Sequence, residues 1–266
     1  MLQYSEFTAA VFVILSISVA SVYGFEPPAT ELLKQAEQAS QKHESAKVIQ
    51  LATKAISQDP KLTRAYYLRA REYFRQEKFR ESVADFDRYV ELRPQIEPQL
   101  WERGISQYYA ELYKEGARQF ELYQTYHDND VENSVWRYLC MVPTDGIGKA
   151  RSVMLPIEND RRIPMMQVFD LFRGKLKPQD VLEVANAKSP PADVLAGQLF
   201  YAHLYLGLYY HAAGEKALAK KYIGLAADPK LAANQRVSRY MWDVARVHAS
   251  YIKKARPDPK RSPPPK

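Results

Sequence analysis

The sequence predicts an all-α protein in which antiparallel helix pairs stack side by side. The first observation is a recurrence every 34 residues, which aligns "SVADFDRYVELRP" (82–94) with "GARQFELYQTYHD" (116–128). The second is that Pro60 and Pro94 lie at the same interval, each after a helical stretch that a proline ends. The third is that no stretch alternates apolar and polar residues well enough to predict a strand.

The N-terminal residues 1–24 are interpreted as a secretory signal peptide. Residues 7–25 carry no charge, and the apolar run at 9–20 is short for a membrane-spanning helix. Cleavage is expected before Phe25, with cleavage after Ala20 as a second option. Because "MLQYSEF" has no Lys or Arg, an uncleaved N-terminal anchor is the alternative. We therefore expect an exported protein that is periplasmic or associated with the cell envelope.

Three repeat units are expected next, at residues 29–62, 63–96 and 97–130. Close crossing of two helices requires small side chains where the backbones approach. Ala70 with Ser82, and Gly104 with Gly116, supply these positions in the second and third units. The large residues Phe86 and Phe120 are expected to fill the space beside the next pair. The first unit is more degenerate, because a valine stands at one small position.

The repeat pattern fades over residues 131–199, which have room for two more hairpins. Prolines and glycines mark the helix limits there. The expected helices are "NSVWRYLCMV" ended by Pro143, "GKARSVML" ended by Pro156, "PMMQVFDLFRG" from Pro164, and "KPQDVLEVANA" with Pro178 in its first turn.

The pattern returns in residues 205–226, where Gly207 and Gly214 occupy hairpin positions. Residues 234–255 are expected to form one long helix that caps the stack. The helical-repeat domain is thus assigned to residues 25–253, with no internal boundary.

These motifs resemble the tetratricopeptide (TPR) superfamily, and the match is best over residues 29–130. "ENSVWRYLCMV", "FRGKLKPQDVLEVAN" and "FYAHLYLGLYYHAAGEKALAKKYI" further resemble NlpI-type envelope lipoproteins of bacteria. The resemblance implies a TPR-type α-α superhelix and a non-catalytic adaptor for envelope proteins. The sequence departs from that family because no cysteine precedes Cys140, so the lipid anchor of its lipoproteins is not expected.

The C-terminal residues 254–266 are basic and rich in proline, and we expect them to be disordered. With Lys253 they hold six basic residues and one acidic residue, so they carry most of the net charge of +7. Outside this segment the charge is close to balanced, and nucleic acid is not an expected partner. The basic tail could instead contact an anionic polymer or membrane surface.

In a TPR stack the first helix of each pair lines the inner face of the superhelix, and its side chains are expected to contact a partner protein or peptide. Arginine and aromatic residues at these positions are typical of binding hot spots. Some of the aromatic residues are expected to pack between helices instead. The candidate groove residues are Arg64, Tyr67, Arg71, Phe74, Arg75, Trp101, Ile105, Tyr108 and Tyr109.

No catalytic residue set, metal site or cofactor site is predicted. "PTDGIGKAR" lacks the glycine and the hydroxyl residue of a phosphate-binding loop. Asp128, Asp130 and Glu132 are better explained as helix-start residues than as a calcium loop. His203 and His211 lie two helical turns apart, and Cys140 fits a buried position better than a nucleophile.

The sequence therefore predicts an exported, non-enzymatic scaffold that binds another envelope protein or peptide through its inner groove. The alternative is an envelope-associated protein that binds an anionic polymer or membrane through its basic tail. The open end of a repeat stack also leaves a homodimer as an option.

Overall fold

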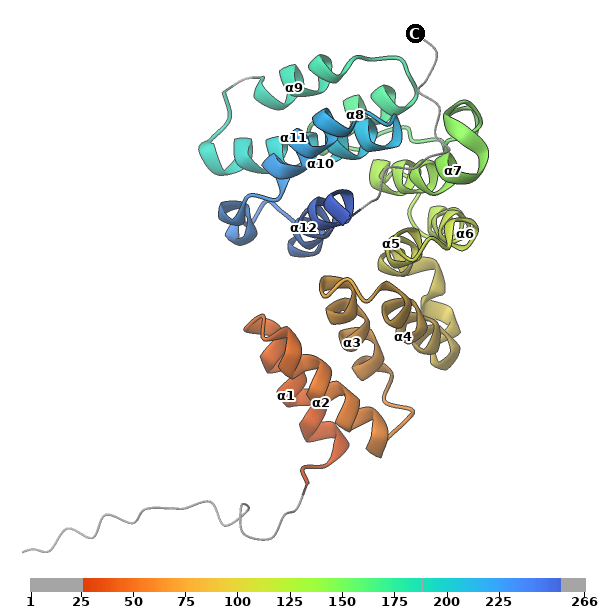
Figure 1. The fold of residues 1–266 in the computed structure, drawn as a ribbon, viewed down its shortest axis with the longest axis vertical. Helices are drawn as coiled ribbons and strands as arrows, with labels where there is room; N and C mark the ends of the chain where they lie inside the picture. Colours follow the sequence, from red (N-terminus) through yellow and green to blue (C-terminus); the bar gives the residue numbers. More distant parts are fainter. Residues whose placement is uncertain (1–25, 188, 255–266) are drawn as a thin grey trace, which may run out of the picture.

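The computed structural model describes residues 26–187 and 189–254, and the regular secondary structure in these ranges is entirely helical, with no strand in either of them. Successive helices pack mainly against their neighbours in the sequence, so that the elements form a stacked array (Figure 1). The predicted all-α helical-repeat architecture is confirmed. The predicted signal peptide at 1–24, and the predicted tail apart from Lys254, lie outside the described residues.

Each of the three predicted N-terminal units forms one antiparallel helix pair. The short helix η2 (Pro94–Gln99) separates the second pair from the third. The pairs are α1 (Ala29–Gln41) with α2 (Ser45–Gln58), α3 (Thr63–Arg75) with α4 (Phe79–Leu92), and α5 (Trp101–Tyr109) with α6 (Tyr113–Gln124).

The backbone repeats with the same period as the sequence. The turn inside each N-terminal pair contains one residue in the left-handed region, namely His43, Glu77 and Glu111, with φ of 58°, 60° and 62°. Gly214 has φ of 82° in the turn of the later pair that the sequence predicted. Only this last turn uses glycine, the residue that adopts positive φ without steric cost.

The small residues lie where the helices cross, as predicted. The Ser82 hydroxyl donates a hydrogen bond of 2.8 Å to the Ala70 carbonyl oxygen on the opposite helix. A Cβ atom at Gly116 would lie 3.3 Å from the carbonyl oxygen of Gly104. Phe120 is buried directly against Gly104, and the equivalent Phe86 is also buried.

The middle region forms α7 (Val131–Ser152), α8 (Met165–Phe172) and α9 (Pro178–Asn186). The prediction that Pro143 ends a helix is wrong. Helix α7 continues past Pro143, and its backbone breaks at Gly146, which has φ of 80°. The two helices predicted around this point are therefore the two parts of α7.

Helices α10 (Ala192–Ala212) and α11 (Lys216–Ala226) form the pair predicted near residues 205–226. A short helix, η3 (Pro229–Ala233), leads from α11 into the C-terminal helix α12 (Arg239–Lys254). Within the described ranges, none of the helices has the length and apolar content that crossing a membrane requires.

Helix α12 does not cap the end of the stack, which corrects the sequence-based prediction. It packs on α11 and returns to α3, and Figure 1 shows it between the α10–α11 pair and helices α3 and α5. Six of its residues belong to the main hydrophobic core: Tyr240, Met241, Trp242, Val244, Ala245 and Val247. An amphipathic helix that buries its apolar side against helices on two sides is more stable there than at an open end.

Candidate functional site

The predicted groove residues lie on α3 and α5, and α12 covers much of the surface that these helices form. We call this surface the inner face. Arg246 of α12 donates a hydrogen bond of 2.6 Å to the Arg75 carbonyl oxygen at the end of α3. Ser250, one turn later on α12, donates to Glu77 at 3.1 Å. The inner face is therefore largely occupied by the protein itself.

Four of the predicted groove residues are buried in the core, and for them the expected partner contact is corrected. Phe74 and Ile105 are fully buried, and Tyr108 and Tyr109 are nearly so. Phe74 stacks on Tyr240 of α12 with ring centroids 5.3 Å apart. The hydroxyl oxygen of Tyr109 lies 2.8 Å from Nδ1 of the buried His248. The residues expected to contact a partner protein are therefore covered by α12 of the same chain.

Arg75 is also engaged by α12. Its guanidinium donates to the Asp243 carboxylate at 2.7 Å and also pairs with Glu72. Both carboxylates are almost completely buried, so the guanidinium compensates charge that water does not reach. This arginine stabilises the contact between α3 and α12.

The other three predicted groove residues of α3 lie nearer the surface. Tyr67 donates to the Glu102 carboxylate at 2.8 Å, and burial is the main cause that raises the pKa of Tyr67 to about 12. The Arg71 guanidinium lies 5.0 Å from the ring centroid of Tyr240. Arg64 is exposed and pairs with Glu37. Partner binding by these three residues stays a prediction.

Trp101 lies at the edge of the surface that α12 covers. Its ring meets the ring of Tyr240 on α12 edge-on, with the two centroids 5.1 Å apart. Beside it lies a pocket of about 140 Å³, which we call the aromatic pocket. Its walls come from α5, α6, α7, α10, α12 and the segment before α8. The lining residues are Trp101, Phe120, Tyr123, Asp130, Glu132, Asn133, Trp136, Arg162, Tyr201, Ser238 and Met241.

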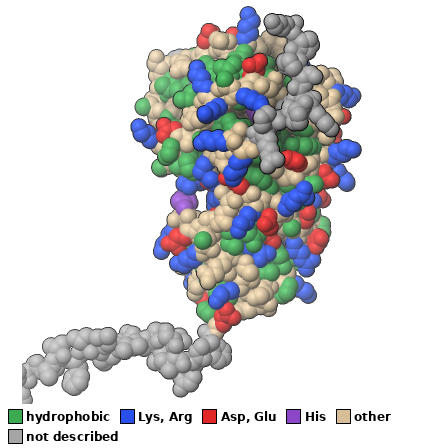
Figure 2. All heavy atoms as spheres, in the orientation of Figure 1, with side chains coloured by type: hydrophobic (Ala, Val, Ile, Leu, Met, Phe, Trp, Pro, Cys, Tyr) green, Lys and Arg blue, Asp and Glu red, His purple; other side chains and the backbone are tan. Residues whose placement is uncertain are grey.

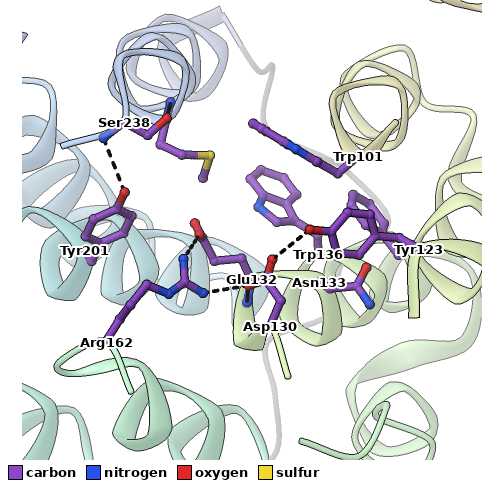
Figure 3. Close-up of a pocket in the computed structure, with 11 residues that line it drawn as sticks. Trp101, Tyr123, Asp130, Glu132, Asn133, Trp136, Arg162, Tyr201 and Ser238 are labelled. Carbon is purple, nitrogen blue, oxygen red and sulfur yellow. Dashed lines mark hydrogen bonds and ion pairs between the residues drawn. The ribbon is translucent and has the colours of Figure 1, made fainter. Parts of the chain in front are cut away.

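Figure 3 shows how these side chains surround the pocket. Trp101, Tyr123 and Trp136 lie on one side, and Tyr201 lies on the other, where its hydroxyl accepts a hydrogen bond from the Ser238 backbone N–H at 3.3 Å. Arg162 and the carboxylates lie between the two sides. The pocket thus combines aromatic walls with an ionic floor.

The floor is built around the Arg162 guanidinium. It donates to Glu132 at 2.6 Å, to Asp130 at 2.7 Å, and to both oxygens of Asp160 at 2.9 and 2.5 Å. The Tyr205 hydroxyl donates to the other oxygen of Glu132 at 2.6 Å. Burial raises the pKa of Glu132 and Asp130 raises it further, while Arg162 opposes both effects. Three carboxylates therefore share one guanidinium.

Sequence reasoning identified Trp101 but missed the rest of the pocket. Asp130 was expected to act at a helix start, and it does accept a hydrogen bond from the Glu132 N–H at the beginning of α7. The same carboxylate also meets Arg162, which lies in an irregular segment about 30 residues later. No periodic signal predicts that contact, because it depends on how α7 and α8 pack.

The candidate reactive groups occupy structural positions. Cys140 is completely buried, and burial raises the pKa of its thiol. His203 is partly buried and its pKa is lowered, mainly by burial and in addition by Lys221. In residues 26–187 and 189–254, no group of three or more His, Cys, Asp or Glu residues is arranged to hold a metal ion.

The sequence matches no protein-family model and no curated protein. The likeness to TPR proteins and to NlpI-type lipoproteins therefore stays a prediction from the quoted motifs.

Proposed function

We propose that this protein is a non-enzymatic scaffold of the cell envelope, exported from the cytoplasm, which binds a segment of another polypeptide. The aromatic pocket is the observation that carries the proposal. Trp101 and Tyr201 line it and are only partly buried, so they combine an open surface with a large apolar area. Tryptophan and tyrosine in such positions are enriched at the energetic centres of protein interfaces.

The location of the pocket also favours a binding role. Residues from widely separated parts of the chain form it, and the surrounding helices are fixed by the core. A site held on rigid helices is preorganised, so less entropy is lost when a partner binds.

Charge on the surface favours a protein partner over nucleic acid. In Figure 2, Lys and Arg side chains are interspersed with Asp and Glu over the visible face, without a continuous basic stripe. Proteins that bind nucleic acid through phosphates need such a concentration of positive charge.

The first test uses Trp101→Ala in the full chain. Affinity purification from a native envelope extract would identify the partner, and titration of the purified partner would give its Kd. We expect the substitution to weaken binding by about 1–4 kcal/mol, the usual range for loss of a hot-spot residue. The matched control is Tyr126→Ala, because Tyr126 is a large aromatic residue that is 58% exposed outside the pocket.

Circular dichroism of Trp101→Ala would show whether the fold survives the loss of its contact with Tyr240. A folded variant that binds the partner with wild-type affinity would contradict the proposal.

The alternative function places binding in the basic tail, and the charge of residues 254–266 favours it. Deletion of this segment distinguishes the two functions. Loss of envelope association with partner binding intact would support surface attachment through the tail. Loss of neither would leave the pocket as the binding site.

A further inference from the structure

We propose that the aromatic pocket receives the cationic side chain, lysine or arginine, of an extended segment of the partner polypeptide. This inference rests on the proposed function, because it names the chemistry that the same pocket recognises. Four features of the pocket support it: its charge, its walls, its unpaired polar atoms and its size.

The charge of the floor calls for a cation. Asp130, Glu132 and Asp160 surround Arg162, so ionisation of all three carboxylates leaves an excess of two negative charges. Four of the Arg162 side-chain hydrogen bonds already go to these carboxylates. The guanidinium is therefore committed, and an anionic ligand would meet net repulsion. A basic group reduces this excess of negative charge.

The walls suit a long side chain with a cationic end. Trp101, Trp136 and Tyr201 all line the same pocket. Aromatic faces attract ammonium and guanidinium groups within about 6 Å of the ring centroid, tryptophan most strongly. The same rings provide apolar contact for the methylene groups of lysine or arginine, which pack along apolar surfaces while the charged end stays with polar groups.

Two buried polar atoms of the lining have no hydrogen-bond partner among the described residues. They are Oδ1 of Asn133 and Nε1 of Trp136, on side chains that are 3% and 1% exposed. The Asn133 orientation is set by its amide N–H, which donates to Gln124 at 2.9 Å. A buried polar group without a partner carries a desolvation cost, and a ligand that pairs with it removes that cost.

These two atoms require different partners. Asn133 Oδ1 is an acceptor and suits the N–H donors of an ammonium or guanidinium group. Trp136 Nε1–H is a donor and suits a carbonyl oxygen, such as that of the peptide backbone. A basic residue within a polypeptide offers both groups, whereas a metal ion or a simple amine does not.

The pocket is large enough for one side chain only. Its volume of about 140 Å³ is close to that of a cavity of about 150 Å³ that holds benzene. It accommodates the end of one basic side chain but not a helix or a folded domain. The partner segment must therefore be extended or present the residue on a loop.

The experiment is a titration of the full chain with blocked pentapeptides, acetyl-Gly-Ala-X-Ala-Gly-amide, followed by tryptophan fluorescence. X is lysine, arginine, norleucine or glutamate. Norleucine keeps all four side-chain carbons of lysine and lacks only its ammonium group. We expect the lysine or arginine peptide to bind at least about tenfold more tightly than the norleucine peptide, and the glutamate peptide to bind most weakly.

Variants that remove a charge test whether the preference for basic peptides arises in the pocket. Glu132→Gln keeps an acceptor for Tyr205 and should reduce the preference for the basic peptide to less than about threefold. Asp130→Asn provides an independent second variant, because asparagine also caps helices well. Glu121→Gln is the matched control: Glu121 is exposed, pairs with Arg137 and lies outside the pocket, so the preference should stay at the wild-type level. Thermal melts confirm that each variant is folded.

Several results would overturn the inference. They are equal or tighter binding of the norleucine or glutamate peptide, no binding of any peptide, or an unchanged preference in both pocket variants. Binding of the basic peptide only after deletion of residues 255–266 would also overturn it, because the chain's own basic segment would then be the occupant.

The peptide titration distinguishes failure of this inference from failure of the proposed function. If basic peptides show no preference but Trp101→Ala still weakens the natural partner, the pocket binds a neutral side chain and the scaffold function stands. If the preference is present but Trp101→Ala leaves partner affinity unchanged, the pocket chemistry stands and the proposed partner site is wrong.

Discussion

Gly207 of α10 has Ile223 of α11 directly against its α-carbon. A Cβ atom at Gly207 would lie 2.5 Å from Ile223 Cγ1 and 2.9 Å from the Ile223 backbone nitrogen. A flexible side chain could move aside, but the backbone of a packed helix moves only with its neighbours. The spacing of this hairpin therefore depends on the absence of one methyl group.

We predict that Gly207→Ala lowers the free energy of unfolding by about 1–3 kcal/mol, the usual cost of overpacking. The matched control is Gly224→Ala on the same hairpin, where no atom lies within 4 Å of the added Cβ. That variant should be neutral or more stable by up to about 1 kcal/mol, because alanine favours the helix. Urea unfolding measures both values. Equal effects of the two substitutions would contradict the predicted packing.

Trp101 and Phe74 show how far the sequence determines a site at the residue scale. Both were expected on the inner face, and both lie there, because the repeat spacing fixes which side of α3 and α5 they occupy. The sequence did not show that Tyr240 would stack on Phe74 and leave Trp101 beside a pocket. Exposure depends on the position of α12, which local spacing does not determine.

At the scale of elements, the helix pairs were predictable because each leaves a local signal. Small residues mark the crossing of α5 with α6, and the 34-residue period fixes where the turns lie. The position of α12 leaves no such signal. Its amphipathic pattern predicts a helix, but its partners on α3 and α5 are more than 100 residues away. The pair between Asp243 and Arg75 arises from the curvature of the whole array.

The contact of α12 with the inner face includes a buried histidine that makes stability depend on pH. Burial lowers the pKa of His248 well below 6.5, and His211 lowers it further. Tyr109 of α5, His211 of α10 and Tyr251 of α12 surround its ring. The folded protein therefore holds this imidazole neutral, while the unfolded chain takes up a proton below about pH 6.5.

Proton uptake by His248 in the unfolded state favours unfolding at low pH. The unfolding free energy is therefore unaffected by His248 above about pH 6.5, and it decreases as the pH falls below this value. At pH 5.5 the loss is about 1.4 kcal/mol for one histidine that stays neutral in the folded state. We predict that wild-type protein loses more unfolding free energy between pH 7.5 and 5.5 than His248→Gln does, by about this amount.

Urea unfolding at the two pH values gives the difference. Other groups with shifted pKa values, such as His203 and Asp160, are present in both proteins and cancel in the comparison. The same pH dependence in both proteins would show that His248 is not held neutral between α12 and the inner face.

For the whole molecule, α12 connects the C-terminal end of the described chain to α3 and α5, in the second and third helix pairs. The main core extends from Phe74 on α3 to Val247 on α12, so the array is closed from α3 onward, whereas the buried residues of α1 and α2 form separate clusters. In a repeat array, each repeat normally contacts only the repeats next to it. Closure converts the inner face into core and leaves the aromatic pocket, beside the N-terminal end of α12, as the site that we propose for binding.

The most direct test of this closure is a double-mutant cycle between Arg75 of α3 and Asp243 of α12. Their side chains lie 2.7 Å apart, although the residues are 168 positions apart in the sequence. Arg75→Met, Asp243→Leu and the double variant would be compared by urea unfolding. As a control, Arg75→Met would be combined with Asp193→Asn, because Asp193 is exposed and pairs with Arg236 instead.

We expect each single substitution at the buried pair to cost about 3–5 kcal/mol, because it leaves a buried charge without one of its partners. The double variant should cost less than the sum by about 1–3 kcal/mol, and the control pair should be additive. Additivity within about 0.5 kcal/mol for Arg75 and Asp243 would contradict the account, because the C-terminal helix would then not lie on the inner face.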